Sequence, residues 1–236
     1  MTKAEVLDKA EAAVGYHFKD RSILATALTH ASLANSRLES NERLEFLGDA
    51  ILGAVVCNEL FDKYPHFLEG ELTKIKSTVV SRRVCAKVAK GLGLPDLLFL
   101  GKGMSGRGQV PSSLAAGVFE SIVAAIYVDS GGLTPTRDFI LQQMGDIIGA
   151  AAESEHQRNF KSQLQQHAQR TLGATPVYEL LDEQGPDHSK CFEVCVVVAN
   201  RRFPGAWGPT KKEAEQKAAL RALKELELVS DDEDFA

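Results

Sequence analysis

The stretch NERLEFLGDA, residues 41–50, places three acidic side chains in an otherwise apolar helical run that continues to Val56. At about 100° per residue, Glu42, Glu45 and Asp49 fall within roughly 60° of one another on one helix face. Like charges held together beside apolar side chains repel unless they bind protons or share a cation. Ligands that are all oxygen favour a hard ion such as Mg²⁺. On spacing alone, a solvated acidic stripe is the alternative.

The composition indicates a soluble globular protein with room for two domains. Of its 236 residues, 44% are hydrophobic and 25% are charged, which suits one domain of ordinary size and a smaller one. No apolar run approaches the roughly 18 residues that span a bilayer, and residues 1–14 lack the order of a secretory signal. We therefore expect a cytoplasmic protein with no membrane partner. The cysteines at positions 57, 85, 191 and 195 are expected to be reduced and structural.

The net charge of −5 argues against a protein that attracts nucleic acid through an overall positive field. Residues 1–158 hold 17 basic and 19 acidic side chains and residues 159–228 hold 10 and 9, so neither segment is strongly basic. The remaining acids lie in residues 229–236, which are interpreted as a disordered solubilising tail. Any binding to nucleic acid must therefore come from local clusters.

Hydrophobic periodicity and capping residues predict helices throughout the first 152 residues. Asp20 is placed to cap the second helix, and His30 at the end of that helix is expected to make a structural hydrogen bond. The glycine-rich loop at 101–108 fits neither common nucleotide-binding spacing, so we expect no nucleotide cofactor. The expected helices cover about 3–14, 20–28, 41–63, 68–89, 112–129 and 135–152.

Glu120 is the anomaly in the run 114–129, which is apolar nearly all round and is typical of a buried central helix. A buried glutamate needs a partner. The acids of residues 41–50 offer a place where one cation satisfies both groups, so we expect the two helices to meet there.

From Asn159 the pattern changes to helix, three strands and helix. Thr210 and Glu213 form the signature of a capping box at the start of the last helix. Lys211 and Lys212 stand in its first turn, where cations oppose the helix dipole, so we expect them to grip phosphate rather than only to be solvated. The expected elements are a helix at 160–167, strands at 177–181, 191–199 and 201–206, and a helix from 211.

The string NERLEFLGD closely resembles the signature motif of ribonuclease III, the endonuclease that cuts double-stranded RNA, and the resemblance extends over nearly the whole chain. The segments 161–165, 185–190 and 211–219 resemble the double-stranded RNA-binding domain that usually follows the ribonuclease III domain. The resemblance implies a multidomain protein, an all-α endonuclease domain followed by a small α+β domain of α-β-β-β-α order. The expected boundaries are 1–152 for the catalytic domain, 153–158 for a linker, 159–228 for the RNA-binding domain and 229–236 for the acidic tail.

The resemblance also implies a Mg²⁺-dependent active site, with Mn²⁺ able to substitute. Its metal ligands are Glu45, Asp49 and Glu120, of which Asp49 and Glu120 are also the catalytic residues. Glu42 and Glu69 organise the site, although stabilisation of the first turn of a helix is the alternative for Glu69. The implied products carry 5′-phosphates and two-nucleotide 3′ overhangs, in the processing of ribosomal, messenger and other structured RNA.

By the same resemblance, residues of the second domain contact double-stranded RNA. Gln165 and Gln166 would reach 2′-hydroxyls in one minor groove, His188 would enter the next, and lysines would grip the phosphates between them. Phe46 would insert into the second subunit of a homodimer in which each catalytic domain cuts one strand. Ordinary core packing is the alternative for Phe46. The RNA-binding residues are Gln165, Gln166, His188, Lys190, Lys211 and Lys212.

Gly117 departs from the family pattern, in which an aspartate three residues before this glutamate also reaches the metal. Glycine supplies no ligand and weakens a helix by about 1 kcal/mol relative to alanine. Three acids can still bind Mg²⁺, which ordinarily keeps several waters, so we expect cleavage to persist. Faster cleavage by Gly117→Asp at low Mg²⁺ would show that the missing carboxylate matters. The alternatives are an RNA-binding protein that has lost cleavage and a helical dimerisation scaffold, and the crowded acids argue against both.

Overall fold

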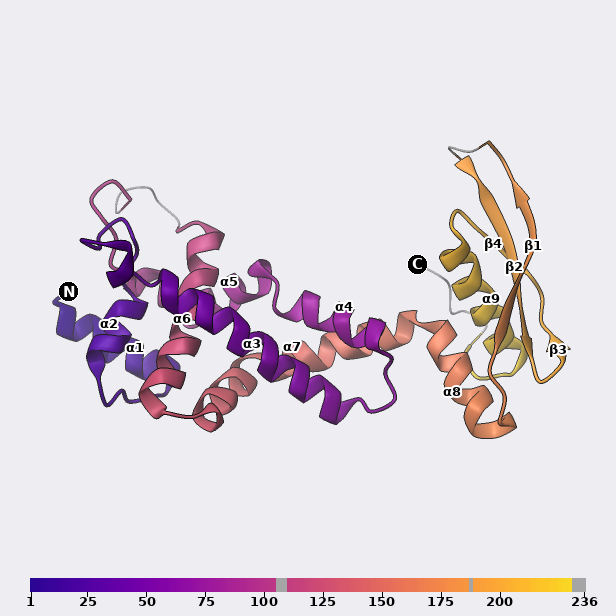
Figure 1. Cartoon of the computed structure of the whole chain (residues 1–236), viewed down its shortest axis with the longest axis horizontal. Helices are drawn as coiled ribbons and strands as arrows, with labels where there is room; N and C mark the ends of the chain where they lie inside the picture. Colours follow the sequence, from indigo (N-terminus) through magenta and orange to yellow (C-terminus); the bar gives the residue numbers. More distant parts are fainter. Residues whose placement is uncertain (105–109, 187–188, 231–236) are drawn as a thin grey trace. The chain divides into compact units, whose positions relative to one another are not determined.

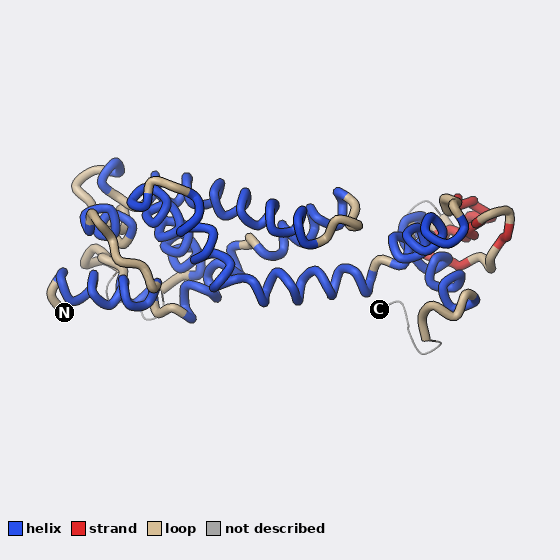
Figure 2. Tube along the Cα trace, turned by 90° about the horizontal axis from the view of Figure 1, so that it is seen from below, coloured by secondary structure: helices blue, strands red, loops and turns tan. Residues whose placement is uncertain are grey.

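The computed structural model describes residues 1–104, 110–186 and 189–230, and its contacts divide the chain into two compact units. The first unit comprises Met1–Pro65 and Leu72–Ala151, and the second comprises His66–Glu71 and Ala152–Ala236. The predicted order, a helical domain followed by an α-β-β-β-α domain, is confirmed. Figure 2 shows the strands of the described residues, in red, in the second unit.

The first unit is built from helices that Figure 1 follows from indigo to magenta. Its short 3₁₀ helices are η1 (Arg37–Glu39) and η2 (Leu94–Leu97). The last α-helix, α7, begins in this unit and runs past its end. The α-helices are α1 (Lys3–Val14), α2 (Arg21–Ala27), α3 (Glu42–Lys63), α4 (Glu69–Val79), α5 (Arg82–Gly91), α6 (Ser112–Ser130) and α7 (Leu133–Arg158).

The apolar helix α6 forms the centre of the first unit and packs most extensively against α3 and α5. Phe119, Ile122 and Ile126 on it are fully buried, as the apolar run predicted. By length and composition, α6 is also the one helix among the described residues that could cross a membrane. The expectation that no apolar run approaches membrane-spanning length is therefore wrong. Because 61% of its apolar window is buried inside the protein, α6 has the character of a core helix.

Two helices differ from their predicted extents. The helix expected at 68–89 is interrupted between α4 and α5, because Ser81 adopts an extended backbone (φ −64°, ψ 147°). Thr78, Val79 and Val80, the β-branched residues before it, have low helix propensity, and the Ser81 hydroxyl donates to the carbonyl of Thr78 at 2.7 Å. The helix expected at 135–152 continues to Arg158, so the residues assigned to a linker are helical.

Asp20 caps α2 as predicted, since its side chain accepts a hydrogen bond from the backbone N–H of Ser22 at 2.8 Å. Asp129, near the end of α6, holds the loop before α2. Its carboxylate accepts hydrogen bonds from the Tyr16 hydroxyl at 2.8 Å and from the backbone N–H groups of Lys19 at 3.0 Å and Asp20 at 2.8 Å. Burial alone would raise the pKa of Asp129, but these hydrogen bonds outweigh it and hold the pKa below its ordinary value.

In the second unit, two helices pack against an antiparallel sheet. Its central strand β2 pairs with β1, β3 and β4. The third strand, expected at 201–206, is split into two short pieces, β3 and β4. Phe203 between them is buried, and its N–H donates to the Val196 carbonyl at 2.9 Å. The elements are α8 (Phe160–Leu172), β1 (Val177–Gln184), β2 (Cys191–Val198), β3 (Arg201–Arg202), β4 (Ala206–Gly208) and α9 (Lys211–Glu225).

The core of this unit lies between the sheet and the two helices. Val196 and Val198 of β2 pack with Phe160 and Leu164 of α8 and with Leu223 of α9. Val196 and Val198, two residues apart on β2, therefore place one face of the strand in this core. The four cysteines of the chain are free thiols, of which Cys85 and Cys195 are buried and Cys57 and Cys191 are exposed.

Candidate active site

The acids of α3 meet Glu120 of α6 because the two helices cross at a glycine. A Cβ atom added to Gly48 would lie 1.8 Å from the Glu120 carbonyl oxygen, so the two backbones touch where the side chain is missing. The buried Ser121 hydroxyl reinforces this crossing, with its oxygen 3.2 Å from the carbonyl of Asn41 and 2.7 Å from that of Gly117. The predicted meeting of the two helices is thus produced by direct backbone contact.

This crossing forms a pocket of about 620 Å³ that we call the acid pocket. Four of the predicted acids, Glu42, Glu45, Asp49 and Glu120, line it together. Glu69 is an exposed residue in the first turn of α4 and is not among the residues that line this pocket. The lining residues are Glu42, Glu45, Phe46, Asp49, Val80, Arg82, Ser113, Ala116, Gly117 and Glu120.

The acid pocket changes the proton affinity of two carboxyl groups. Burial, followed by repulsion from Glu45 and Asp49, raises the pKa of Glu120 to about 7, although Arg82 opposes the shift. Burial and then repulsion from Glu42 likewise raise the pKa of Glu45. Asp49 and Glu42 are exposed, so α3 presents these two acids at an open face.

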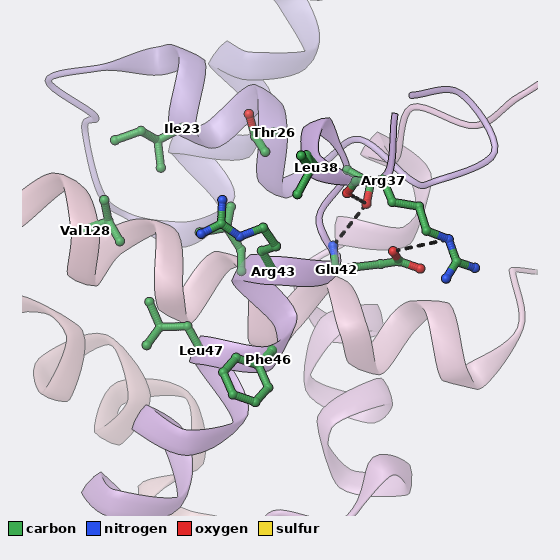
Figure 3. A pocket seen from close by; sticks show the side chains of 11 residues that line it. Ile23, Thr26, Arg37, Leu38, Glu42, Arg43, Phe46, Leu47 and Val128 are labelled. Atoms are coloured by element: carbon green, nitrogen blue, oxygen red, sulfur yellow. Dashed lines mark hydrogen bonds and ion pairs between the residues drawn. The ribbon is translucent and has the colours of Figure 1, made fainter. Parts of the chain in front are cut away.

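Phe46 lies on the same open face of α3, and its side chain is 81% exposed. Core packing, the alternative for this residue, is therefore wrong. Phe46 lines both the acid pocket and a neighbouring apolar pocket of about 730 Å³. Figure 3 shows this apolar pocket, with Phe46 and Leu47 on α3 and Val128 on α6. Its lining residues are Ile23, Thr26, Arg37, Leu38, Ser40, Glu42, Arg43, Leu44, Phe46, Leu47 and Val128.

Comparison with known protein families matches both units. Residues 20–147 match the family described as Ribonuclease-III-like, and residues 160–226 match the double-stranded RNA binding motif. The chain belongs to the ribonuclease III family. Like its relatives, this ribonuclease III is a hydrolase, an endoribonuclease of double-stranded RNA, and it carries its own double-stranded RNA-binding domain.

Its relatives share most of the chain. Ribonuclease 3 of Rhodopirellula baltica is 50% identical over 93% of this chain and 82% of its own length. Ribonuclease 3 of Symbiobacterium thermophilum is 43% identical over 89% of this chain and 90% of its own. Among solved structures, the nuclease domain of ribonuclease III from Campylobacter jejuni superposes with a TM-score of 0.56 and 34% identity, covering 59% of this chain and 96% of that one.

The acid pocket of this ribonuclease III has the donor chemistry of a hard-metal site, and metal dependence is typical of the family. Glu45, Asp49 and Glu120 supply only carboxylate oxygens, and burial together with repulsion between neighbouring acids raises the pKa values of Glu45 and Glu120. Within the described residues, no three His, Cys, Asp or Glu side chains converge closely enough to enclose an ion. The donor set therefore fits a divalent cation, with side chains that must draw together around it.

A basic pocket of about 500 Å³ adjoins the acid pocket through Arg82, which lines both. Sequence reasoning missed it. The sequence feature that could have indicated this pocket is the spacing of Arg83, Lys87 and Lys90, which are four and then three residues apart. This spacing places three cations on one face of α5. Ser112, at the start of α6, also lines this pocket.

The residues predicted to bind RNA are distributed over the second unit. Lys211 and Lys212 are exposed in the first turn of α9, after Thr210, whose hydroxyl accepts from the N–H of Glu213 at 3.2 Å. Lys190 Nζ lies 3.6 Å from a carboxylate oxygen of Glu183.

Gln165 and Gln166 of α8 are half-buried, and the Gln166 amide donates to the His66 carbonyl at 3.2 Å. His188 lies outside the described residues. The structural role predicted for His30 is confirmed, because its Nδ1 accepts from the N–H of Ser32 at 3.1 Å.

Proposed function

We propose that this ribonuclease III cuts double-stranded RNA at the acid pocket, where Glu45, Asp49 and Glu120 hold Mg²⁺, with Mn²⁺ able to replace it. The supporting observation is that carboxylates from α3 and α6 line one pocket, in which burial and repulsion from Glu45 and Asp49 raise the pKa of Glu120. When bound, the metal supplies a water made nucleophilic at neutral pH and stabilises charge on the departing 3′ oxygen.

The chain's own side chains orient the reacting groups. Carboxylate oxygens of Asp49 and Glu120 accept hydrogen bonds from the attacking water and fix its direction of approach. Glu42, which lines the pocket, orients the site. Glu69, which does not line the pocket, is assigned a role in orienting the substrate only by the family resemblance. Arg82, which lines the pocket beside them, offers a guanidinium to the phosphate oxygens.

RNA is held mainly by the second unit in this proposal. Lys211 and Lys212 lie in the first turn of α9, at the N-terminal end of the helix dipole, an arrangement suited to phosphate oxygens. Gln165 and Gln166 of α8 reach 2′-hydroxyls of a minor groove, His188 enters the next one, and Lys190 also contacts the RNA. These contacts read the shape of the duplex, so sequence preference is expected to be weak.

The working form in this proposal is a homodimer. Phe46 and Phe61 on the exposed face of α3 are 81% and 72% exposed, which is unusual for aromatic side chains of a monomer. The Campylobacter relative has a region involved in dimer formation in its nuclease domain. With one catalytic domain per strand, the products carry 5′-phosphates and two-nucleotide 3′ overhangs. We further expect the enzyme to act in the cytoplasm on ribosomal, messenger and other structured RNA.

The other candidate is a protein that binds duplex RNA without cutting it, and Gly117 favours it because the position lacks a carboxylate. A long end-labelled RNA duplex, incubated with the protein in Mg²⁺, Ca²⁺ or EDTA, separates the two. We expect discrete cuts in Mg²⁺ that Glu120→Gln abolishes. Asp62→Asn, at an exposed acid of α3 outside the pocket, serves as the matched control and should cut normally. Duplex binding without cutting in every metal would establish the binding protein instead.

A further inference from the structure

Gly117 on α6 faces the carboxylate of Glu45 on α3. A Cβ atom added to Gly117 would lie 2.5 Å from Glu45 Oε2 and 2.8 Å from Glu45 Cδ, closer than van der Waals contact allows. Both residues line the acid pocket. The end of the Glu45 side chain therefore fills the volume that any side chain at position 117 would need.

Separating the two groups by moving the helices apart would break the packed crossing of α3 and α6, where the Ser121 hydroxyl oxygen lies 3.2 Å from the Asn41 carbonyl oxygen. Gly48 of α3 already touches the Glu120 backbone, one turn after Glu45 and one turn after Gly117 in their respective helices. Relief of a clash at position 117 must therefore come from the Glu45 side chain, which would rotate away from α6.

We propose that Gly117 is a positioning residue, because its missing side chain lets the Glu45 carboxylate lie against α6 beside Glu120. This inference rests on the proposed function, since its consequence is that Glu45 already occupies the place of a ligand from position 117. The glycine is then not a lost ligand. Adding a side chain there removes one carboxylate from the site even when it supplies another.

Gly117→Ala tests the proposal because stability and metal affinity should change in opposite directions. Alanine favours a helix over glycine, and moving Glu45 away from Glu120 relieves repulsion, so the melting temperature in EDTA should rise. Binding of Mn²⁺, followed by the electron paramagnetic resonance of the free ion, should weaken about tenfold, as for the removal of a group that orients ligands. Gly145→Ala is the matched control, since a Cβ at Gly145 on α7 meets nothing within 4 Å. It should raise the melting temperature and leave Mn²⁺ affinity unchanged.

Gly117→Asp in two backgrounds gives a second, independent measurement. In the wild-type background we expect no tighter binding of Mn²⁺, because the new carboxylate displaces that of Glu45. In the Glu45→Ala background, where the obstacle is gone, Gly117→Asp should restore much of the affinity that Glu45→Ala removes. An equal increase in Mn²⁺ affinity in both backgrounds would mean that positions 45 and 117 act independently, and would overturn the proposal.

The outcomes also separate this inference from the proposed function. A wild-type protein that binds no Mn²⁺ would remove the metal site, and with it both claims. A wild type that binds Mn²⁺ and a Gly117→Ala variant that binds equally well would overturn only the positioning role of Gly117.

Discussion

Gly48 shows at the scale of one residue how an absent side chain builds the active site. The helix backbones of α3 and α6 touch at this position, and the acids on both helices depend on that contact. We predict that Gly48→Ala lowers the free energy of unfolding by about 2 kcal/mol, the usual cost of overpacking, and also lowers cleavage, because the helices must move apart. Urea denaturation and duplex cleavage are the measurements.

Gly53→Ala on the same helix is the control for Gly48→Ala. A Cβ at Gly53 would meet only the end of the Lys76 side chain, at 3.7 Å, which is ordinary contact. This variant should be as stable as the wild type or slightly more stable, because alanine favours the helix. If both alanine variants behave alike, the close approach at Gly48 does not determine the crossing.

Asp129 gives a prediction of pH dependence at the same scale. Its pKa is lowered in the folded protein, so the native state binds fewer protons there than the unfolded chain does. The contribution of the Asp129 carboxylate to the stability of the folded protein is therefore fully present above the ordinary pKa of an aspartate, about 4. This contribution is lost as the pH falls through the lowered pKa. Asp129→Asn should cost about 2 kcal/mol at pH 7, with a smaller difference from wild type at pH 3. Urea denaturation at both pH values measures this, with the exposed Asp138→Asn as the control. A difference from wild type that did not shrink at pH 3 would contradict the charge-based account.

At the scale of one element, α5 presents a face of three cations, Arg83, Lys87 and Lys90. The break at Ser81 separates α5 from α4 and leaves its cationic face beside the acid pocket. We predict that Arg83→Ala/Lys87→Ala weakens duplex binding and makes the slope of log affinity against log salt less steep, by about 0.9 for each phosphate that the protein no longer neutralises. Filter binding over a range of salt concentrations checks this.

A pair of lysines away from the acid pocket controls for the change of net charge. Lys9→Ala/Lys19→Ala alters the total charge equally in the region of α1 and α2, and the salt slope should stay at the wild-type value. If both double variants change the slope equally, only the total charge matters and the basic pocket does not touch RNA.

At the scale of the whole molecule, the exposed face of α3 predicts the oligomeric state. Phe46→Asp places a charge where an aromatic side chain would be buried against a second subunit, and desolvation of that charge opposes association. We expect the wild type to sediment as a dimer at micromolar concentration and Phe46→Asp to sediment as a monomer with impaired double-strand cleavage. Leu133→Asp, at an exposed apolar residue of α7, should remain dimeric. A monomeric wild type that still makes double-strand cuts would contradict the proposed arrangement.

The sequence alone was sufficient for features that depend on neighbours within a few residues. The bounds of α1 and the caps at Asp20 and Thr210 follow from local hydrogen bonds and from hydrophobic periodicity. The acids of α3 and Glu120 were also found this way, because charge inside an apolar run stands out within a single helix.

Other features exist only because distant residues meet. The contact between Gly48 and Glu120, the Glu45 carboxylate over Gly117 and the pocket formed by α5 and Ser112 join residues from different helices. Helical periodicity identifies the face of a side chain but not the partner helix or the distance between the two backbones. Packing sets those distances. Only the tertiary structure therefore shows that the Glu45 carboxylate of α3 fills the space beside Gly117 of α6.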